Sequence, residues 1–444
     1  MGNYIDDIIL TKKEKIKNKK NVYEVGKVTS VQTYLLEVSG INNAGFFDKI
    51  IIQRKKEGVI AEGYVDKINK DSLIVALTRK DKEVMIDDEA IATGEEFMMQ
   101  YSPDCLGHIV DMFGTDLLSG QKFNELYDLP VECENISIMD RGPVNRPFYT
   151  GVTGIDLMYP IGKGQRQLII GDKRTGKTQI ALDAIVNQQN DDVICIYVAI
   201  GKTKKEVKTI YAELSKRGAM EYTTIMAAFN DECPPVLRNT PYAAVTIANM
   251  LLMNGKDVLV VIDDLKRHAD VCREIALLSG KIPGRDAYPS DIFHSHASLL
   301  EKGCQHQNGG SITILPICET KGGDITDYIS TNIISITDGQ IVLSTKNFEK
   351  GQKPAINYGL SVSRLGGAVQ TGVMKKASAV VRRELLSYLE TRDVYELVNE
   401  NEMSHELQEK MRRGRLILEK LCQPKYSPRT ESNIVKSFAD LYKK

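Results

Sequence analysis

The strongest chemical signal in the sequence is a glycine-rich run that ends in a lysine and a threonine. Residues 171–178 read GDKRTGKT, a complete GxxxxGK[ST] pattern, between the strand-like QLIIG and the helix-like KTQIALDAIV. In this context the backbone N–H groups cradle phosphates, the lysine reaches the terminal phosphates and the threonine hydroxyl meets Mg²⁺. We expect ATP or ADP to be bound by Gly171, Asp172, Lys173, Arg174, Thr175, Gly176, Lys177, Thr178 and the following Gln179.

An acidic residue follows a second apolar run. VLVVIDD puts Asp263 and Asp264 after five apolar residues, and an Asp in that position ends a strand at the carboxyl edge of the sheet. We expect Asp263 to hold Mg²⁺ together with Thr178. The alternative is that one of the two aspartates only caps the following helix, DLKRHADVCREIALL.

A lysine stands where ATP hydrolysis would need a base. The group that orients and deprotonates the attacking water commonly follows the strand beside the phosphate loop, here taken as ICIYVAIG, and the next residue is Lys202. A protonated lysine cannot accept that proton, so it favours holding ATP over cleaving it. The nearest carboxylate, Glu206, lies one helical turn further on and remains an alternative base for hydrolysis.

Three regions must position these residues. Residues 23–93 hold short β-rich runs with Gly and Asn-Lys-Asp breaks, typical of a small barrel. Residues 94–357 alternate apolar strands with helical segments, which predicts an α/β core with a mostly parallel sheet. Asp338-Gly339 in ISITDGQIVL predicts a hairpin. Residues 358–444 show helical spacing, and residues 1–22 form a charged tail.

Composition excludes several classes. The 444 residues carry a net charge of −1, which supplies no general attraction for nucleic acid, and no apolar run is long enough for a membrane span. The start of the chain does not resemble a secretory signal, so we expect a cytoplasmic protein. The eight cysteines form no CxxC pair and predict buried thiols. His294 and His296 at i, i+2 lie on different faces of a helix and predict no metal cluster.

Several motifs in the same order make the chain similar to a known family. GVTGIDLMYPIGKGQRQLIIGDKRTGKTQIALDAI, VIDDL, GRDAYPSDIFHSHASLLEK, PAINYGLSVSRLGGAVQ and QPKYSP resemble the alpha subunit of F-type rotary ATPases. The resemblance implies a β-barrel crown, a RecA-like P-loop core and a C-terminal helical bundle, and the bundle expected here departs from the family in being shorter. It implies a hexameric ring that alternates with a beta-type catalytic subunit around a gamma-type shaft, which Asn399–Glu402 would face.

The resemblance also implies roles for residues outside the loop. In this family the alpha subunit binds Mg-ATP without turnover and has glutamine where Lys202 stands here. Arg364 in GLSVSRLGG matches the arginine finger that enters the partner's catalytic site. The adenine and ribose would be surrounded by Phe348, Lys353, Pro354, Gln423 and Lys425. Lys353, Lys425 and the pair Lys173-Arg174 depart from the family pattern, which affects the expected affinity.

The sequence therefore predicts a non-catalytic, Mg-ATP-binding subunit at the inner face of the cell membrane, without nucleic acid as a partner. The complex is expected to be either a proton-coupled ATP synthase or an ATP-driven motor for surface or gliding machinery in a mollicute. The motor is favoured by two observations: the barrel sequence matches the family only loosely, and the chain is rich in Lys, Ile and Asn and has no Trp. The alternatives are a self-sufficient homohexameric RNA translocase, which would need a basic barrel with exposed aromatics, and a secretion ATPase, which would need a carboxylate at position 202.

Overall fold

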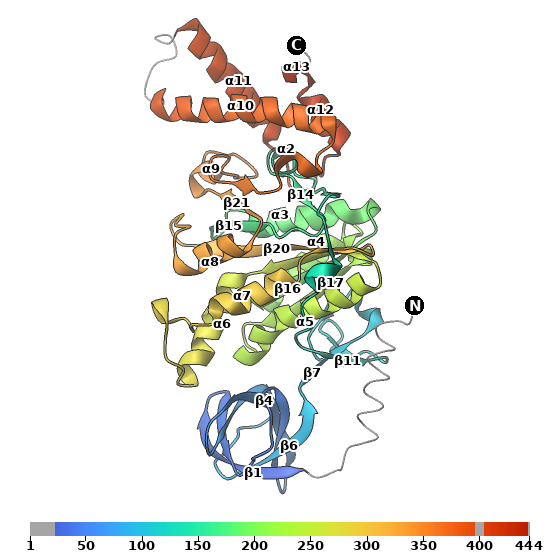
Figure 1. Cartoon of the computed structure of the whole chain (residues 1–444), viewed down its shortest axis with the longest axis vertical. Helices are drawn as coiled ribbons and strands as arrows, with labels where there is room; N and C mark the ends of the chain where they lie inside the picture. The colour runs from blue at the N-terminus through green and yellow to red at the C-terminus, as the bar shows by residue number, and fades with distance from the viewer. Residues whose placement is uncertain (1–22, 396–403, 443–444) are drawn as a thin grey trace.

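The protein has three regions stacked along one axis (Figure 1). The computed structural model describes residues 23–395 and 404–442. A barrel lies at one end, a large sheet covered by helices lies in the middle, and the last helices lie at the other end. The predicted tail 1–22 and the shaft-facing turn Asn399–Glu402 lie outside the described residues.

Six strands close into the predicted barrel in the order β1-β2-β5-β4-β3-β6. Apolar side chains fill its interior; in β3, where buried residues alternate with more exposed ones, Ile50 and Ile52 are fully buried. The sequence did not predict β6, which crosses the predicted boundary at residue 93 and ends at Glu96. The strands are β1 (Glu24–Gln32), β2 (Leu35–Ser39), β3 (Asp48–Arg54), β4 (Gly58–Ile68), β5 (Leu73–Lys80) and β6 (Glu89–Glu96).

The middle region is built on one mixed sheet in the order β10-β9-β8-β17-β16-β18-β20-β15-β21-β22. Pairing is parallel from β8 to β21 and antiparallel at the two edges, which confirms the mostly parallel α/β core. The strands are β8 (Ile109–Val110), β9 (Thr115–Asp116), β10 (Gln121–Lys122), β15 (Leu168–Asp172), β16 (Val193–Lys202), β17 (Thr223–Phe229), β18 (Asp257–Asp263), β20 (Ser311–Thr320), β21 (Gly339–Leu343) and β22 (Val362–Ser363).

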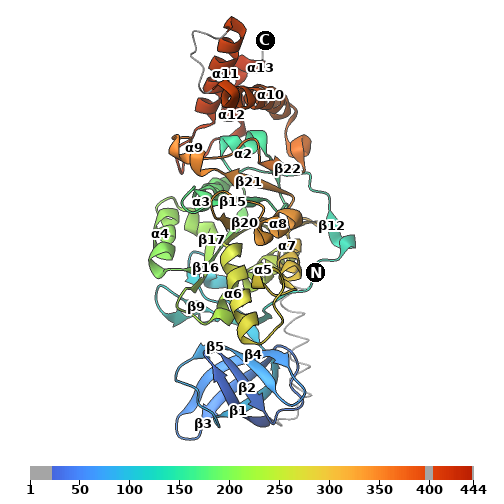
Figure 2. The same ribbon diagram turned by 90° about the vertical axis from the view of Figure 1, so that its left-hand side faces the viewer.

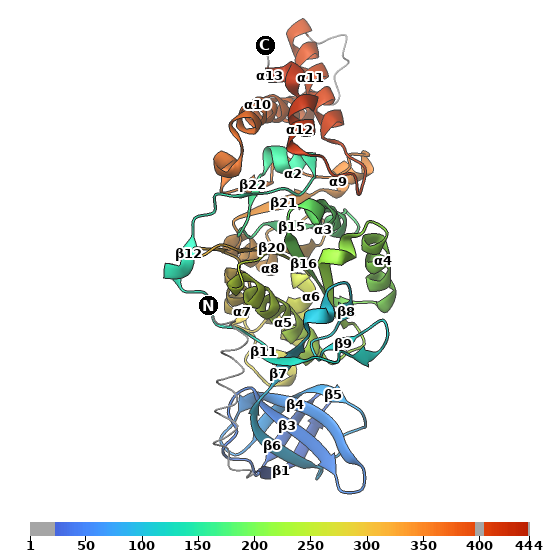
Figure 3. The same cartoon turned by 90° about the vertical axis from the view of Figure 1, so that its right-hand side faces the viewer.

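Smaller strands border this sheet. β12 and β19 extend it, whereas β7 pairs with β11 and β13 pairs with β14 in two separate ribbons. Figure 3 shows the β7–β11 ribbon between the barrel and the large sheet. Their bounds are β7 (Met98–Tyr101), β11 (Tyr127–Pro130), β12 (Arg141–Gly142), β13 (Pro147–Phe148), β14 (Ile161–Gly162) and β19 (Gln305–His306).

The sheet separates two hydrophobic clusters because successive side chains of a strand point to opposite faces. In β16, Ile196 and Val198 join one cluster, with helices α5, α6, α7 and α8, while Cys195 and Tyr197 join the other, with α2, α3 and α4. The bounds of these helices are α2 (Thr153–Met158), α3 (Lys177–Val186), α4 (Lys204–Ser215), α5 (Pro234–Met253), α6 (Leu265–Leu278), α7 (Ile292–Glu301) and α8 (Tyr328–Ile336). A further short helix, α9 (Thr345–Glu349), follows β21.

The predicted hairpin at Asp338-Gly339 is wrong. The isoleucines before it belong to helix α8, where Ile333 is fully buried, and the residues after it form β21, which pairs in parallel with β15. Asp338 accepts hydrogen bonds from Arg166 and joins a helix to a strand. β-branched residues were mistaken for a strand because packing between helices overrides their local preference.

Helices form the end of the chain, as predicted. α10 (Gly372–Tyr395) packs along α11 (His405–Leu421), followed by α12 (Glu431–Ser437) and α13 (Ala439–Tyr442). The two long helices approach closely at Gly414, where an added Cβ would lie 2.0 Å from Cγ of Tyr388. Only glycine allows this approach.

A buried ion pair joins the barrel to the core. Arg238 of α5 donates through Nη2 to Oδ1 of Asp66 on β4 at 2.6 Å, and also to the hydroxyl of Tyr64. The Asp66 side chain is 1% exposed and that of Arg238 is 17% exposed. The barrel is therefore held to α5 by charges that are largely withdrawn from water.

Candidate nucleotide-binding site

The phosphate-loop pattern lies between β15 and α3, as its sequence context requires. Gly176 has φ of 100° at the start of α3, and no side chain caps the first N–H groups of that helix. Lys177 is buried and donates from Nζ to the backbone oxygens of Gly171 and Asp172, at 2.8 and 2.7 Å. Uncapped N–H groups at a helix start and a buried ammonium are the donors that phosphate requires, so the loop fits a nucleotide.

Carboxylates surround the ammonium of Lys177. Burial lowers its pKa, and the charges of Glu319, Asp264 and Asp263 oppose that shift without cancelling it. Asp172 holds the loop in place, because its carboxylate accepts from the hydroxyls of Thr320 and Thr345 and from the N–H of Gly323. The loop is thus tied to the end of β20 and to α9.

Three polar side chains contact the carboxylate of Asp263 at the end of β18. Its Oδ2 accepts from Thr178 Oγ1 at 2.7 Å and from the Tyr197 hydroxyl at 2.6 Å. Its Oδ1 lies 3.0 Å from Nζ of Lys202. The residue is 2% exposed. Its neighbour Asp264 caps α6 by accepting from the N–H of Arg267, so the capping alternative holds for Asp264.

Mg²⁺ fits this arrangement less well than the nucleotide does. A hydroxyl and a carboxylate are the oxygen ligands that Mg²⁺ prefers. However, an ammonium already pairs with Oδ1 of Asp263, and two hydroxyls occupy Oδ2. No cluster of three or more metal-ligating side chains occurs in residues 23–395 and 404–442.

The position of Lys202 corrects one prediction. β16 does not lie beside the phosphate-loop strand, because β18 and β20 separate it from β15. Lys202 still reaches the site, since β16 pairs with β18 and brings it to Asp263. Burial acts to lower the pKa of Lys202, but the charge and hydrogen bond of Asp263, with the charges of Asp264 and Glu206, outweigh it and raise that pKa.

The carboxylate of Glu206 is engaged elsewhere. Its Oε2 accepts from the N–H and the hydroxyl of Thr203, at 2.9 and 2.7 Å, in a capping box that begins α4. These bonds lower its pKa. Glu206 is therefore committed to the helix start.

Sequence reasoning missed two residues here. Glu319, the residue before the last of β20, lies opposite Gly171 of β15 in the parallel register, which puts a carboxylate at the strand next to the loop. Tyr197 contacts Asp263 from the middle of β16. The run ILPICET could have suggested Glu319, because it ends a buried strand; Tyr197 had no signal.

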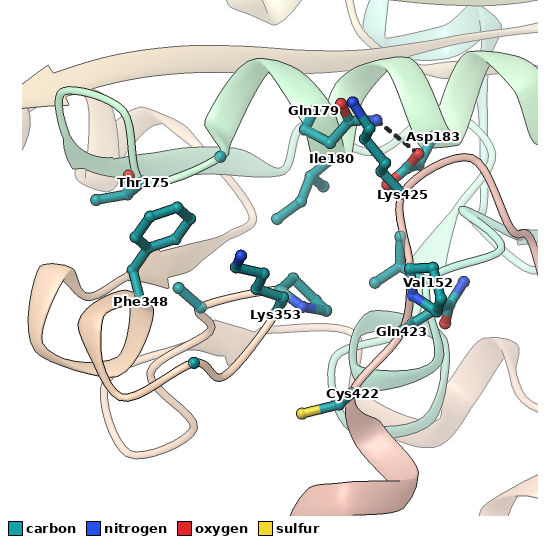
Figure 4. A pocket seen from close by; sticks show the side chains of 15 residues that line it. Val152, Thr175, Gln179, Ile180, Asp183, Phe348, Lys353, Cys422, Gln423 and Lys425 are labelled. Atoms are coloured by element: carbon teal, nitrogen blue, oxygen red, sulfur yellow. Dashed lines mark hydrogen bonds between the residues drawn. The ribbon is translucent and has the colours of Figure 1, made fainter.

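A cavity of about 690 Å³ opens beside the loop. Figure 4 shows Thr175 and Phe348 at one end and Val152 and Gln423 at the other. Many of its side chains are apolar, as a nucleobase requires. The predicted residues that line it are Thr175, Gly176, Gln179, Phe348, Lys353, Pro354, Gln423 and Lys425, and the unpredicted ones are Val152, Ile180, Asp183, Gly351, Ala355, Cys422 and Pro424.

Two of the lining side chains have clear partners. The ammonium of Lys353 lies 5.3 Å from the ring centre of Phe348, so the two form a cation–π pair at the cavity wall. Gln179 donates to Oδ1 of Asp183 at 2.9 Å, as Figure 4 shows, and the N–H of Tyr426 donates to the same oxygen. Burial raises the pKa of Asp183.

The amide of Gln423 joins two segments rather than pointing freely into the cavity. Its oxygen accepts from the N–H and the hydroxyl of Thr153, at 3.0 and 2.8 Å. Its nitrogen donates to the backbone oxygens of Gly151 and Ser427, both at 2.7 Å. Its amide is therefore engaged within the protein, which leaves the aliphatic part of Gln423 to face the cavity.

Arg364 directly follows β22, at the edge of the sheet. It is exposed, and its guanidinium donates to the backbone oxygen of Ile334 at 3.3 Å. β22 and α9, which carries the cavity residue Phe348, lie on opposite sides of the molecule (Figures 2 and 3). Arg364 therefore lies away from the cavity of its own chain.

Other features agree with the sequence. All eight cysteines are free, and six of them are buried. Among the described residues, no helix combines the length and the apolarity that a membrane crossing needs.

The fold and the phosphate loop define a P-loop nucleotide-binding protein with a barrel before the α/β core and helices after it. Residues 151–363 match the model of the ATP synthase alpha/beta family, nucleotide-binding domain. The chain is 42% identical over 390 residues to ATP synthase subunit alpha of Acetivibrio thermocellus, covering 87% of this chain and 76% of that protein. It is 39% identical over 427 residues to ATP synthase subunit alpha of Lactobacillus johnsonii, covering 96% and 84%. The chain belongs to the F-type ATP synthase alpha subunit family.

Proposed function

We propose that this chain is a non-catalytic, nucleotide-binding subunit that alternates with a beta-type catalytic subunit in a hexameric ring around a gamma-type shaft. The observation that carries the proposal is the ion pair between Lys202 and Asp263. It holds an ammonium, which cannot accept a proton from water, against the carboxylate at the end of β18. ATP or ADP would be held by Lys177 and the loop, with the base in the neighbouring cavity. Mg²⁺, where present, would meet Thr178 and Asp263.

The described carboxylates near the loop support a holding role. An ammonium cannot take a proton from water, and Glu206 is committed to its capping box. Asp263 is paired with Lys202, and Asp264 caps α6. Glu319 is the remaining carboxylate whose charge acts on Lys177, so it is the residue that a test of turnover must address.

Arg364 is proposed as the arginine finger of the partner's catalytic site. Its exposure, and its place on the side of the sheet away from α9, suit a residue that acts in a neighbouring chain. A finger supplied in trans stabilises charge in the transition state and is worth about 10³–10⁵ in rate.

The complex would lie at the inner face of the cell membrane and would either synthesise ATP by proton coupling or work as an ATP-driven motor. The motor proposal, for gliding or surface machinery of a mollicute, rests on composition and on the divergent barrel sequence. Purification of the intact complex distinguishes them, because a synthase carries membrane subunits that conduct protons.

The barrel offers little support for an RNA translocase. Of its five aromatic residues, Tyr34 and Tyr64 are buried and Phe47 stacks on Tyr64, which leaves Tyr23 and Phe46 as the largely exposed rings. Stacking of successive bases needs several exposed rings along a basic groove.

ATPase assays of the chain alone, and of the chain mixed with its beta-type partner, test the non-catalytic role. We expect turnover only in the mixture. Substantial turnover by the chain alone that Lys177→Ala abolishes would show that it is catalytic. Glu319→Gln then decides the cause, since loss of that turnover would identify Glu319 as the base.

The finger is tested by Arg364→Lys in the assembled ring. We expect ATPase activity to fall by about 10³-fold or more, because an ammonium does not reproduce bidentate contacts to phosphoryl oxygens. Arg383→Lys, at another exposed arginine, is the matched control. Full activity of the Arg364 variant would remove the assignment.

A further inference from the structure

The carboxylate of Asp263 is already neutralised within the chain. Its Oδ1 pairs with Lys202 at 3.0 Å, and its Oδ2 accepts from Thr178 and Tyr197 at 2.7 and 2.6 Å. The Asp263 side chain is 3% exposed and that of Lys202 is 19% exposed. A cation that approached Asp263 would therefore compete with a fixed ammonium and with two hydroxyl groups that satisfy the other oxygen.

The ammonium stands where a divalent ion is normally held, with one positive charge in place of two. In a phosphate-loop site, the metal ion neutralises phosphate oxygens and is held by the loop hydroxyl and the strand carboxylate. Lys202 stands at that carboxylate, and Lys177 stands on the loop. Two ammonium groups thus flank the place where the terminal phosphates of a bound nucleotide would lie.

Two further positive side chains belong to the loop itself, where Lys173 and Arg174 are exposed. The nearby Lys204, at the start of α4, pairs instead with Asp231 at 3.1 Å, away from Asp263. The loop therefore carries positive charge of its own beside the two ammonium groups.

We infer that Lys202 replaces the divalent cation at Asp263, so that this site binds free ATP and ADP with little dependence on Mg²⁺. The inference rests on the proposed nucleotide-binding function. It adds that the ligand is the metal-free nucleoside polyphosphate. It predicts that Lys202 makes affinity insensitive to metal, which a purely structural ion pair would not do.

Isothermal titration of the full chain with ATP, in excess Mg²⁺ and in EDTA, measures this directly. We expect the two dissociation constants of the unaltered chain to agree within about 3-fold, whereas Lys202→Gln should bind at least about 10-fold more tightly with Mg²⁺ than in EDTA. Lys202→Arg keeps the charge and should remain insensitive to metal. Lys204→Gln removes a nearby charge that does not touch Asp263 and is the matched control.

A second measurement reports the cation itself. Electron paramagnetic resonance of Mn²⁺ in the presence of ATP should show no tight ion on the unaltered chain and one on the Lys202→Gln chain. This readout also covers the case in which the variant is less stable, because bound Mn²⁺ is itself evidence of a formed site.

The outcomes separate this inference from the proposed function. If the unaltered chain loses about 10-fold or more in affinity in EDTA, or binds Mn²⁺ tightly with ATP, the inference is wrong and the nucleotide site stands. If ATP does not bind under either condition, the proposed nucleotide-binding function fails, and the inference fails with it.

Discussion

Gln423→Glu distinguishes a residue that contacts nucleotide from one that holds the cavity together. The change keeps the side chain's shape but replaces its NH₂ group with an oxygen. That oxygen would face the backbone oxygens of Gly151 and Ser427, which now accept from the amide at 2.7 Å. The two bonds from Thr153 to the other oxygen remain possible.

The magnitude follows from the lost donors. Two hydrogen bonds disappear, worth about 1 kcal/mol each, and the Ser427 oxygen loses its partner beside a residue that is 8% exposed, at about 1 kcal/mol or more, whereas the Gly151 oxygen still accepts from the N–H of Arg429. We therefore expect the free energy of unfolding to fall by about 3 kcal/mol at pH 8. The pKa of the introduced carboxyl is raised in the folded state, so the loss should shrink as pH falls through that pKa, where the acid can donate one bond.

Urea unfolding at pH 8 and pH 5 measures the loss, and ATP titration measures affinity. Gln121→Glu, at an exposed site, adds the same charge without burial and should change little. A loss below about 1 kcal/mol combined with a clear fall in ATP affinity would refute this reasoning, because Gln423 would then act on the nucleotide directly.

Two further predictions concern stability. Burial, together with the charges of Asp111 and Asp231, raises the pKa of Glu232 to about 7 in the folded chain against a usual 4.5. The folded state thus keeps a proton that the unfolded chain releases, and stability falls as pH rises from 4.5 to 7. Glu232→Gln should remove up to about 3 kcal/mol of that fall, and equal pH dependence of urea unfolding in the two chains would contradict it. Gly414→Ala should cost about 1–3 kcal/mol, because its Cβ would overlap Tyr388, whereas Gly372→Ala, with open space around it, should cost little; melting temperatures that match between the two would contradict the close packing.

Local patterns in the sequence were enough to predict the phosphate loop and most strands. The run QLIIG was correctly placed on β15 and the following GKT at the start of α3, because strand, turn and helix are all specified within about twenty residues. Asp264 as a helix cap is equally local. The barrel strands other than β6 were predicted because each is a short β-rich run bounded by breaks such as Gly and Asn-Lys-Asp, which are also local signals.

What the sequence could not supply was the order of strands in the sheet. Lys202 was predicted beside the loop strand, but two strands intervene, and its true partner Asp263 follows from the pairing of β16 with β18. Glu319 went unnoticed for the same reason, since only the register of β20 against β15 brings it to the loop. Gln423 was predicted as a ligand from motif similarity, which carries no information about where an amide's four bonds go.

The ion pair between Arg238 and Asp66 limits how the chain can be divided for experiments. A fragment that starts after Glu96 would keep Arg238 but lose Asp66 and Tyr64, and would leave a guanidinium in an apolar surface without its acceptors. The fragment would lose the contacts of this pair, although removal of the barrel also opens the guanidinium to water. The core would lose the cover that the barrel gives it as well, since residues of both share one hydrophobic cluster. We therefore expect either part expressed alone to be less stable than the full chain.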